Sequence, residues 1–430
     1  MPRVLIVSPH FPPTNAPPIH RVRTLLPFFR ENGWQAEVLA VVPRCVAAPV
    51  DDWLVGGLPS GIVVHRADAL GLGWSKVPGL GSLGFRSLPA LMRIGDQIIA
   101  NRNFDLVYFS TTVFEVHILG PRWVKKFGVP FVMDYQDPWV SDYYRDRPTV
   151  VPPGGRIKYR LASALGRWME PLVLSKCSGI TSVSPEYPVQ LRRRYTNLPT
   201  LPSLVQPFAA ARHDFQRAVT SEVVQDQFRP DDGKLHWVYA GVIVPSMLPI
   251  IRALFRAIAG CMSPLERSSL ALHFIGTRYA AVSDPTHSQL RDIAAEFGIA
   301  DLVYEKPARI PYSETLKCML DANALLAFGT DDPGYTPSKI FPCLLASKPL
   351  LALYHYKSPV VAVLAATGGA VCLTFSDPFD EDAVVAQIGN NWVAGNKHSI
   401  TVPVDALGFE KYLDRNCARD ICSFFDSIVR

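Results

Sequence analysis

The stretch that decides the fold reads RVLIVSP (3–9), RVRTLLPFFRENG (21–33) and AEVLAVVP (36–43). The first and third segments are short apolar runs typical of buried parallel strands. The middle segment has the spacing of an amphipathic helix, which we expect to end at Gly33. A strand, a helix and a second strand in this order form one βαβ unit, from which parallel sheets are built.

Strand-like runs of the same kind recur along the rest of the chain. In the first half they are FDLVYFST (104–111), VPFVMDY (129–135) and GITSVSP (179–185). In the second half they are LHWVYAG (235–241), ALHFIG (271–276), NALLAFG (323–329), KPLLALY (348–354) and AVCLTF (370–375), with helical patterns such as SMLPIIRALFRAIAG (246–260) and YSETLKCMLDA (312–322) between them. The sequence therefore predicts an α/β protein with two Rossmann-like halves. Ligands of such sheets bind beyond the carboxyl ends of the strands.

The length of 430 residues exceeds what one ordinary hydrophobic core supports, so two domains are expected. The stretch 198–234 contains several prolines and the charged sequence RPDDGK, and we expect the linker there. We predict an N-terminal domain over 1–205 and a C-terminal domain over 206–408. The last segment, 409–430, has the apolar spacing of a helix.

Composition excludes several classes of protein. Hydrophobic residues make up 48% and charged residues 19% of the chain, which is typical of a globular protein and not of a disordered one. The net charge of +5 allows anionic ligands or a membrane surface. The basic run Arg192–Arg194 is short and is interpreted as a solvated helix face, so no nucleic acid partner is expected.

The cysteines and the apolar runs indicate a cytoplasmic protein. None of the eight cysteines forms a C-x-x-C pair, so neither a zinc site nor a disulfide framework is expected, and the thiols should be mostly buried. The N-terminal apolar run VLIV is too short for a signal peptide, and no run reaches the roughly 18 to 20 apolar residues that cross a bilayer.

Residues 53–92 interrupt the alternation, because they are rich in Gly, Leu and Trp and poor in charge. We favour the hypothesis of a loop and a helix packed on the N-terminal domain. The other hypothesis is an apolar flap near a lipid-linked acceptor or the inner face of a membrane.

Several motifs occur in an order that resembles one enzyme family. They are FPPTNAPPIHRVRTLLPFFRENGW, GVPFVMDYQDPWVSDYY, GITSVSPEYPVQLRRRY, LHWVYAGVI and TPSKIFPCLLASKPLLAL. Their order is similar to that in family 4 glycosyltransferases, which are retaining, sugar-nucleotide-dependent enzymes with the GT-B fold. The DPW and PSK-x-F elements resemble a subset that builds surface or secreted glycans.

The resemblance implies two Rossmann-like domains whose sheets face each other across a cleft. The first would hold a glycan, lipid-linked or small-molecule acceptor, the second the nucleotide-sugar donor, and 409–430 would be a helix that crosses back to the first domain. It implies a hexosyltransferase that works with retention, without metal and without a cofactor besides the donor.

In the N-terminal half, the candidate site residues are His20, Arg21, His117 and Asp137. Arg21 opens the first helix and offers a planar fork for a phosphate or an anionic acceptor, with His20 beside it; a solvent-exposed helix charge is an equal alternative. His117 resembles the family histidine that faces the donor sugar, and Asp137 resembles the aspartate that suits acceptor hydroxyls. A packed histidine and an Asp-Pro turn are the alternatives, and Asp134 is a second candidate carboxylate.

In the C-terminal half, the candidate donor-binding residues are Gly241, Thr336, Ser338 and Lys339. Gly241 ends a strand and opens a loop toward the donor. Ser338 would cap a helix, and Lys339 would add a point charge for phosphate, although a surface lysine is the alternative. The segment after Gly241 lacks the Arg and Lys that many members of the family carry there, which makes Lys339 the main candidate.

Two family glutamates are absent. The positions that would carry them are Gly334 and Pro342, and Asp331 or Asp332 is the candidate substitute for the sugar contact, with Asp332 preferred as catalytic. Pro342 is tolerable only if its helix begins two or three residues earlier. Two hypotheses follow, an active glycosyltransferase with a rearranged donor site and an inactive GT-B binding or partner subunit. A nucleotide-sugar epimerase ranks last, because no clear carboxylate pair supports its acid–base chemistry.

Overall fold

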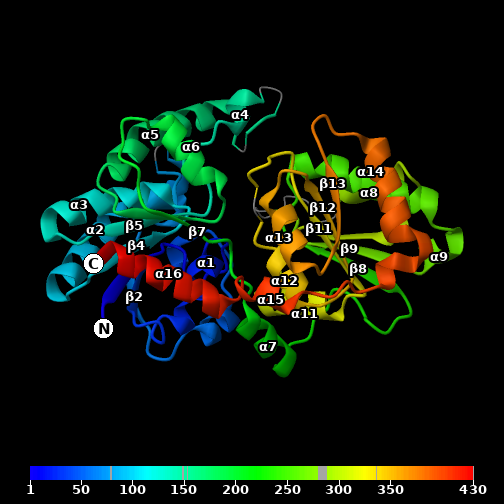
Figure 1. Cartoon of the computed structure of the whole chain (residues 1–430), viewed down its shortest axis with the longest axis horizontal. Coiled ribbons are helices and arrows are strands. Elements are labelled where there is room, and N and C mark those ends of the chain that lie inside the picture. The colour runs from blue at the N-terminus through cyan, green and yellow to red at the C-terminus, as the bar shows by residue number, and fades with distance from the viewer. Residues whose placement is uncertain (78–79, 148–149, 153, 279–287, 336, 430) are drawn as a thin grey trace. The chain divides into compact units, whose positions relative to one another are not determined.

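The computed structural model describes residues 1–77, 80–147, 150–152, 154–278, 288–335 and 337–429 (Figure 1). The chain divides into two compact units. Unit 1 comprises Met1–Ala209 with Asp414–Arg430, and unit 2 comprises Ala210–Leu413. Each unit contains its own parallel sheet and is treated separately below.

Unit 1 is built on a seven-stranded sheet in the order β3-β2-β1-β4-β5-β6-β7, in which all neighbouring strands are parallel. The strands are β1 Arg3–Val7, β2 Gln35–Val41, β3 Val63–Ala67, β4 Leu106–Ser110, β5 Phe131–Tyr135, β6 Gly179–Ser182 and β7 Ser203–Val205. The α-helices are α1 Ile19–Arg23, α2 Leu83–Asn101, α3 Leu119–Phe127, α4 Tyr143–Asp146, α5 Arg156–Leu174, α6 Glu186–Arg194 and α16 Asp414–Val429. The order reverses between β1 and β4, which makes the carboxyl ends of these two strands the expected place for a ligand.

The prediction of one helix over 21–33 is wrong. The chain forms the short helix α1 and then a separate 3₁₀ turn, η1 (Leu26–Phe28), before Gly33 adopts a φ of +82°. Pro27 explains the break, because it lacks the backbone N–H that a continuing helix would need.

Helix α16 closes one face of the unit 1 sheet. Its residues Cys417, Ala418, Ile421 and Phe425 have no exposed surface and belong to the same apolar cluster as β1 and β4. The ring of Phe425 lies 5.0 Å from that of Tyr108, 5.4 Å from that of Trp34 and 6.1 Å from that of Phe29, all in edge-on geometry. Offset and edge-on pairs of this kind add to the energy of burial.

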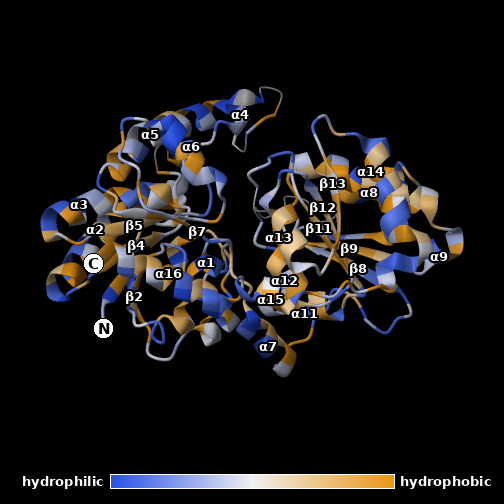
Figure 2. Ribbon diagram, in the orientation of Figure 1, coloured by the Kyte–Doolittle hydropathy of each residue, from blue (hydrophilic) through white to orange (hydrophobic). Residues whose placement is uncertain are grey.

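Unit 2 is built on a six-stranded parallel sheet in the order β10-β9-β8-β11-β12-β13. The strands are β8 Leu235–Ala240, β9 Leu270–Ile275, β10 Val303–Lys306, β11 Ala324–Phe328, β12 Leu350–His355 and β13 Val371–Phe375. The α-helices are α7 Arg212–Thr220, α8 Leu248–Cys261, α9 Pro264–Ser268, α10 Gln289–Ala295, α11 Tyr312–Asp321, α12 Ile340–Leu345, α13 Pro359–Thr367, α14 Glu381–Ile388 and α15 Ala406–Glu410. The central strands of both sheets are mostly hydrophobic, as expected for strands covered on both faces (Figure 2).

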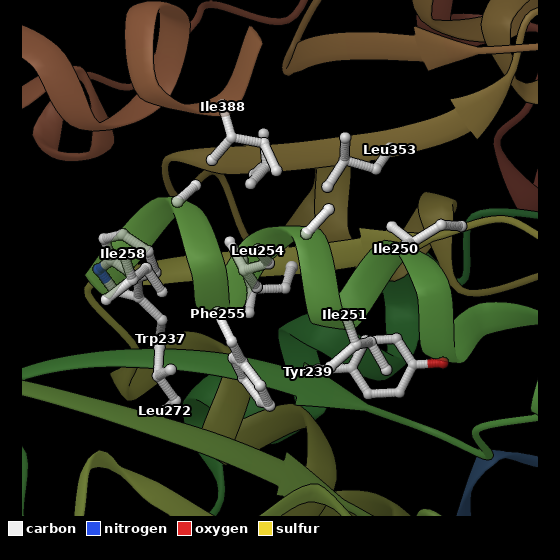
Figure 3. Close-up of a cluster of buried hydrophobic side chains, with 14 of the residues drawn as sticks. Trp237, Tyr239, Ile250, Ile251, Leu254, Phe255, Ile258, Leu272, Leu353 and Ile388 are labelled. Carbon is white, nitrogen blue, oxygen red and sulfur yellow. The ribbon is translucent and has the colours of Figure 1, made fainter. Parts of the chain in front are cut away.

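The core of unit 2 forms around α8. Figure 3 shows Leu254, Phe255 and Ile258 of this helix among side chains of the sheet such as Trp237 and Leu272. The apolar residues of α8 recur at the helical period, so one helix fills the space over several strands. The tight packing also fixes the ring of Tyr239, whose hydroxyl lies at the edge of the cluster (Figure 3).

Two further observations concern the whole described chain. No helix among the described residues is long and apolar enough to cross a membrane. All eight cysteines are free thiols, and all of them except Cys261 and Cys372 are buried, which confirms the expectation of mostly buried thiols.

Replacement of Phe425 by alanine tests whether α16 is part of the unit 1 core. The variant removes a fully buried ring with three aromatic neighbours, so the free energy of unfolding of unit 1 should fall by about 3–5 kcal/mol in denaturant titrations. The matched control is Ser423→Ala on the exposed face of the same helix, which should change the free energy by less than about 0.5 kcal/mol. Equal effects of the two changes would contradict this packing.

Candidate functional site

The reversal of strand order in unit 2 lies between β8 and β11. The chain runs from β8 outward to β9, and from β11 outward to β12 on the other side. In open parallel sheets, ligands bind beyond the carboxyl ends of the two strands at such a point. Gly241 directly follows β8, and Lys339 lies in the segment between β11 and β12.

The structure brings Gly241 and Lys339 together at this position. The ammonium of Lys339 donates to the hydroxyl of Tyr239 at 2.9 Å and to the carbonyl of Val242 at 3.2 Å. It also lies 4.8 Å from the centre of the Tyr239 ring, within the range of a cation–π interaction. The charge is therefore held at the carboxyl end of β8 by the residues on both sides of Gly241.

Gly241 is required by this arrangement. Its φ of +140° is a conformation that residues with side chains rarely adopt. A Cβ atom at this position would lie 2.1 Å from both Cε and Nζ of Lys339. The lysine side chain thus fills the space that any other residue at 241 would need.

Burial and positive neighbours shape the electrostatics of Lys339. Desolvation of the half-buried ammonium, together with the charge of Arg309, lowers the pKa of Lys339 to about 7. Among the described residues, no carboxylate forms an ion pair with Lys339. The ammonium of Lys339 and the nearby charge of Arg309 form a region of positive potential that suits an anion.

Arg309 and Tyr239 are members of this region that the sequence did not identify. Arg309 lies in KPARIP (306–311), directly after the carboxyl end of β10, and this position is the signal that would have marked it. Tyr239 lies within β8, and an apolar strand gives no sign that its hydroxyl will meet a lysine one hundred residues later.

The helix that follows begins at Ile340, and its N-cap residue is Lys339, with no side-chain cap. The expectation that Ser338 caps the helix is therefore wrong. Pro342 is the third helical residue, where a backbone N–H would have no partner inside the helix, so the helix tolerates it. Ser338 is half-buried beside Lys339, and Thr336 lies outside the described residues.

Asp332 has a structural partner in the loop after β11. Its carboxylate oxygen Oδ1 accepts from the backbone N–H of Gly334 at 2.9 Å. The side chain therefore stabilises its own turn, as aspartates often do. Its contact with a donor sugar stays a prediction.

His117 follows β4 at the switch point of unit 1, on the 3₁₀ turn η5 (Phe114–Ile118). Nδ1 lies 2.8 Å from the carbonyl of Phe114, so it carries the proton and donates, which leaves Nε2 as an acceptor. Nε2 is buried and has no hydrogen-bond partner among the residues that the structure describes. Desolvation lowers the pKa of His117 to about 4, so the ring is neutral near pH 7. A neutral acceptor suits the predicted contact with a hydroxyl group.

Asp137 lies two residues after β5, and its side chain is exposed. Nearby protein atoms displace part of the surrounding water and raise the pKa of this carboxyl group to about 6. Trp139 stacks on Phe114 with ring centres 5.6 Å apart and also contacts the ring of His117. The rings of Phe114, His117 and Trp139 thus form one aromatic group, and Trp139 is two residues from Asp137 in the sequence.

Arg21 forms a buried ion pair with Asp134. Nε and Nη2 of Arg21 lie 3.2–3.3 Å from the carboxylate, and Nη1 donates to the carbonyl of Pro207 at 2.8 Å. Asp134 also accepts from Ser110 at 2.9 Å and from Thr181 at 2.7 Å. Arg21 is therefore not the exposed helix charge considered above, and a contact with a phosphate would require these bonds to break.

Two observations lie outside these groups. His20 is half-buried on α1, and its Nδ1 lies 3.3 Å from Nη2 of Arg23.

A cavity of about 230 Å³ lies between α5 and α6, lined by residues such as Leu174, Ile180 and Leu201. Because Ile180 and Leu201 lie near the amino ends of β6 and β7, this cavity is at the opposite edge of the sheet from the candidate residues.

Among the described residues, no group of three or more His, Cys, Asp or Glu side chains is arranged to hold a metal ion.

Comparison with known proteins identifies the fold of the chain. No family model and no curated protein matches the chain. Sucrose-phosphate synthase from Thermosynechococcus elongatus superposes with a TM-score of 0.58 at 13% identity, covering 100% of this chain and 96% of that one. HepE from Anabaena, in complex with UDP and glucose, gives 0.61 at 11% identity, with coverages of 99% and 100%. A trehalose-6-phosphate protein from E. coli bound with UDP-2-fluoro glucose gives 0.59 at 12% identity, with coverages of 99% and 97%.

The chain has the GT-B fold. Its two Rossmann-like sheets and the similarity over the full length to these proteins show this directly. At 11–13% identity the likeness concerns the fold alone.

Replacement of Gly241 by alanine tests the packing of Lys339 on β8. The variant combines an unfavourable φ with a clash against Lys339, so unit 2 should lose about 1–3 kcal/mol more than it loses through φ alone. Gly298→Ala is the control for a positive φ without a clash, because Gly298 has a φ of +69° and no atom within 4 Å of the added Cβ. Denaturant titration of both variants measures the difference, and equal losses would contradict the observed contact.

Proposed function

We propose that this chain is a glycosyltransferase that moves a hexose from a nucleotide-sugar donor to a glycan, lipid-linked or small-molecule acceptor, with retention and without a metal. Unit 2 holds the donor, and unit 1 holds the acceptor. The product belongs to polysaccharide biosynthesis. The proposal includes membership of family 4, which rests on the order of the sequence motifs.

The observation that carries the proposal is the ammonium of Lys339 at the switch point of unit 2. It lies beside a glycine that no other residue can replace without displacing the lysine. It has Arg309 nearby and no carboxylate partner among the described residues. A diphosphate placed beyond the carboxyl end of β8 would meet this charge and the backbone around Gly241 at close range.

The similar structures support the choice of a nucleotide sugar. The HepE structure contains UDP and glucose, and the E. coli structure contains UDP-2-fluoro glucose. UDP and UDP-glucose are therefore the first ligands to test. Within unit 1, Nε2 of His117 is the proposed acceptor for a sugar hydroxyl, since the ring is neutral and Nε2 has no partner among the described residues of the unit.

A second candidate function is a GT-B binding or partner subunit that no longer transfers sugar. The specific observation in its favour is the absence of both family glutamates, at Gly334 and Pro342. The nearest candidate substitute, Asp332, already accepts a hydrogen bond from Gly334. Binding of a nucleotide without release of nucleoside diphosphate from any sugar nucleotide would favour this function.

Thermal stability against a panel of nucleoside diphosphates and their sugars tests the proposal. A ligand that binds the folded state raises the melting temperature, and a ligand at one hundred times its Kd stabilises by about 2.7 kcal/mol. One base should stand out in the native chain, and Lys339→Ala should lose most of that shift. The assay is run about one pH unit below 7, where the Lys339 ammonium is mostly charged.

Lys348→Ala is the matched control for this assay. Lys348 lies two residues before β12, at the amino end of the sheet, so its loss should leave the shift unchanged. The proposal is contradicted if no nucleotide at millimolar concentration changes the melting temperature, or if the two lysine variants behave alike.

A further inference from the structure

Helix α5 of unit 1 exposes a continuous row of large apolar side chains. Their exposed fractions are 79% for Ile157, 68% for Leu161, 61% for Trp168 and 50% for Leu172. The opposite face of the helix is buried through Met169, Glu170, Val173 and their neighbours. Isolated exposed apolar residues are normal on a protein surface, but four on one helix face need an explanation.

The four residues form one row because of their spacing. Positions 157, 161, 168 and 172 are separated by four, seven and four residues. With 3.6 residues per turn, they fall within an arc of about 60° around the helix axis. The row extends over about 22 Å, from the rise of about 1.5 Å per residue.

Cations border this row on both sides. Lys158 lies on one flank of the row and Arg160 on the other, and Lys176 is exposed just after the end of the helix. Arg192 and Arg193 are exposed at the end of the neighbouring helix α6. Hydrophobic and charged residues thus occur together along this solvent-facing helix (Figure 2).

Two acidic side chains at this helix, Glu170 and Asp142, already have partners. Glu170, the only acidic residue of α5, is buried and accepts from the hydroxyls of Tyr135 and Tyr195. Asp142 forms ion pairs with Arg167 and Arg194. The solvent-facing surface of α5 is therefore apolar with a positive border.

We propose that α5 binds an anionic membrane surface, with its apolar row inserted at the boundary between headgroups and acyl chains and its cations among the headgroups. An apolar face with Trp and Leu, flanked by Lys and Arg, is the pattern of helices that lie in the plane of a membrane. We would expect a surface that binds another protein to carry both positive and negative charges at its border. The exposed charged residues of α5 are all cations, and this complements anionic lipids. The inference does not depend on the proposed sugar transfer.

This surface differs from the segment that the sequence suggested. Residues 53–92 contain β3, the beginning of the packed helix α2, and the five-residue turn η4 (Leu72–Lys76), and the exposed apolar side chains around this turn are Leu70, Leu72, Trp74 and Val77. Helix α5 differs because its apolar side chains form one row along a regular helix, with exposed cations on both flanks.

Cosedimentation of the full chain with vesicles tests the proposal. The chain should bind phosphatidylcholine vesicles that contain phosphatidylglycerol, bind vesicles of phosphatidylcholine alone much less, and dissociate as salt rises. The double variant Trp168→Ser with Leu172→Ser should weaken binding by about tenfold or more. Lys158→Glu with Lys176→Glu should weaken binding to the anionic vesicles only.

The matched control is Leu407→Ser, which removes an apolar side chain that is 81% exposed on a helix without such a row. This variant should bind vesicles as the native chain does, and melting curves should show that all the variants are folded. Absence of vesicle binding by the native chain would overturn the proposal. A native dimer that becomes monomeric in the Trp168 and Leu172 variant, with no difference in vesicle binding, would assign the row to a second copy of the chain instead.

Discussion

The ammonium of Lys339 occupies the space that a side chain at position 241 would fill, and the chemistry proposed for unit 2 depends on this contact. The residue after β8 must adopt a positive φ that glycine allows, the Tyr239 ring must be fixed by the core, and α12 must begin at Ile340. Each condition holds the charge at the one place in the sheet where strand order reverses. Burial then lowers its pKa to about 7, so a bound anion would also stabilise the charged form.

The two units use buried charge differently. In unit 1, Arg21 and Asp134 satisfy each other and their neighbours, so this pair holds the ends of β4, β5 and β6 together. Removal of one partner from such a pair is costly, because the other charge stays buried without compensation. In unit 2, Lys339 donates to neutral acceptors alone within the described part of the chain, and we propose that its charge binds a ligand.

The sequence predicted most strands, because buried parallel strands appear as short apolar runs between turns. It did not predict β3, β7 or β10, which are short, partly polar strands at or near sheet edges. Gly241 is predicted from the end of a strand and Lys339 from a sequence motif, each without reference to the other. Their contact, the partner Tyr239 and the nearby Arg309 could not be predicted, because they depend on where segments distant in the chain meet. Arg21 was assigned to a ligand because no local pattern revealed its pairing with Asp134.

The most direct test of the central claim is a calorimetric comparison of two ligands that differ only in phosphate. The nucleoside diphosphate that stabilises the protein most and the matching nucleoside are titrated into the native chain and into Lys339→Ala. If Lys339 binds the diphosphate, the variant loses about tenfold or more in affinity for the diphosphate, as expected for a charge-assisted hydrogen bond, and keeps its affinity for the nucleoside. An equal loss for both ligands, or no loss for either, would contradict the account.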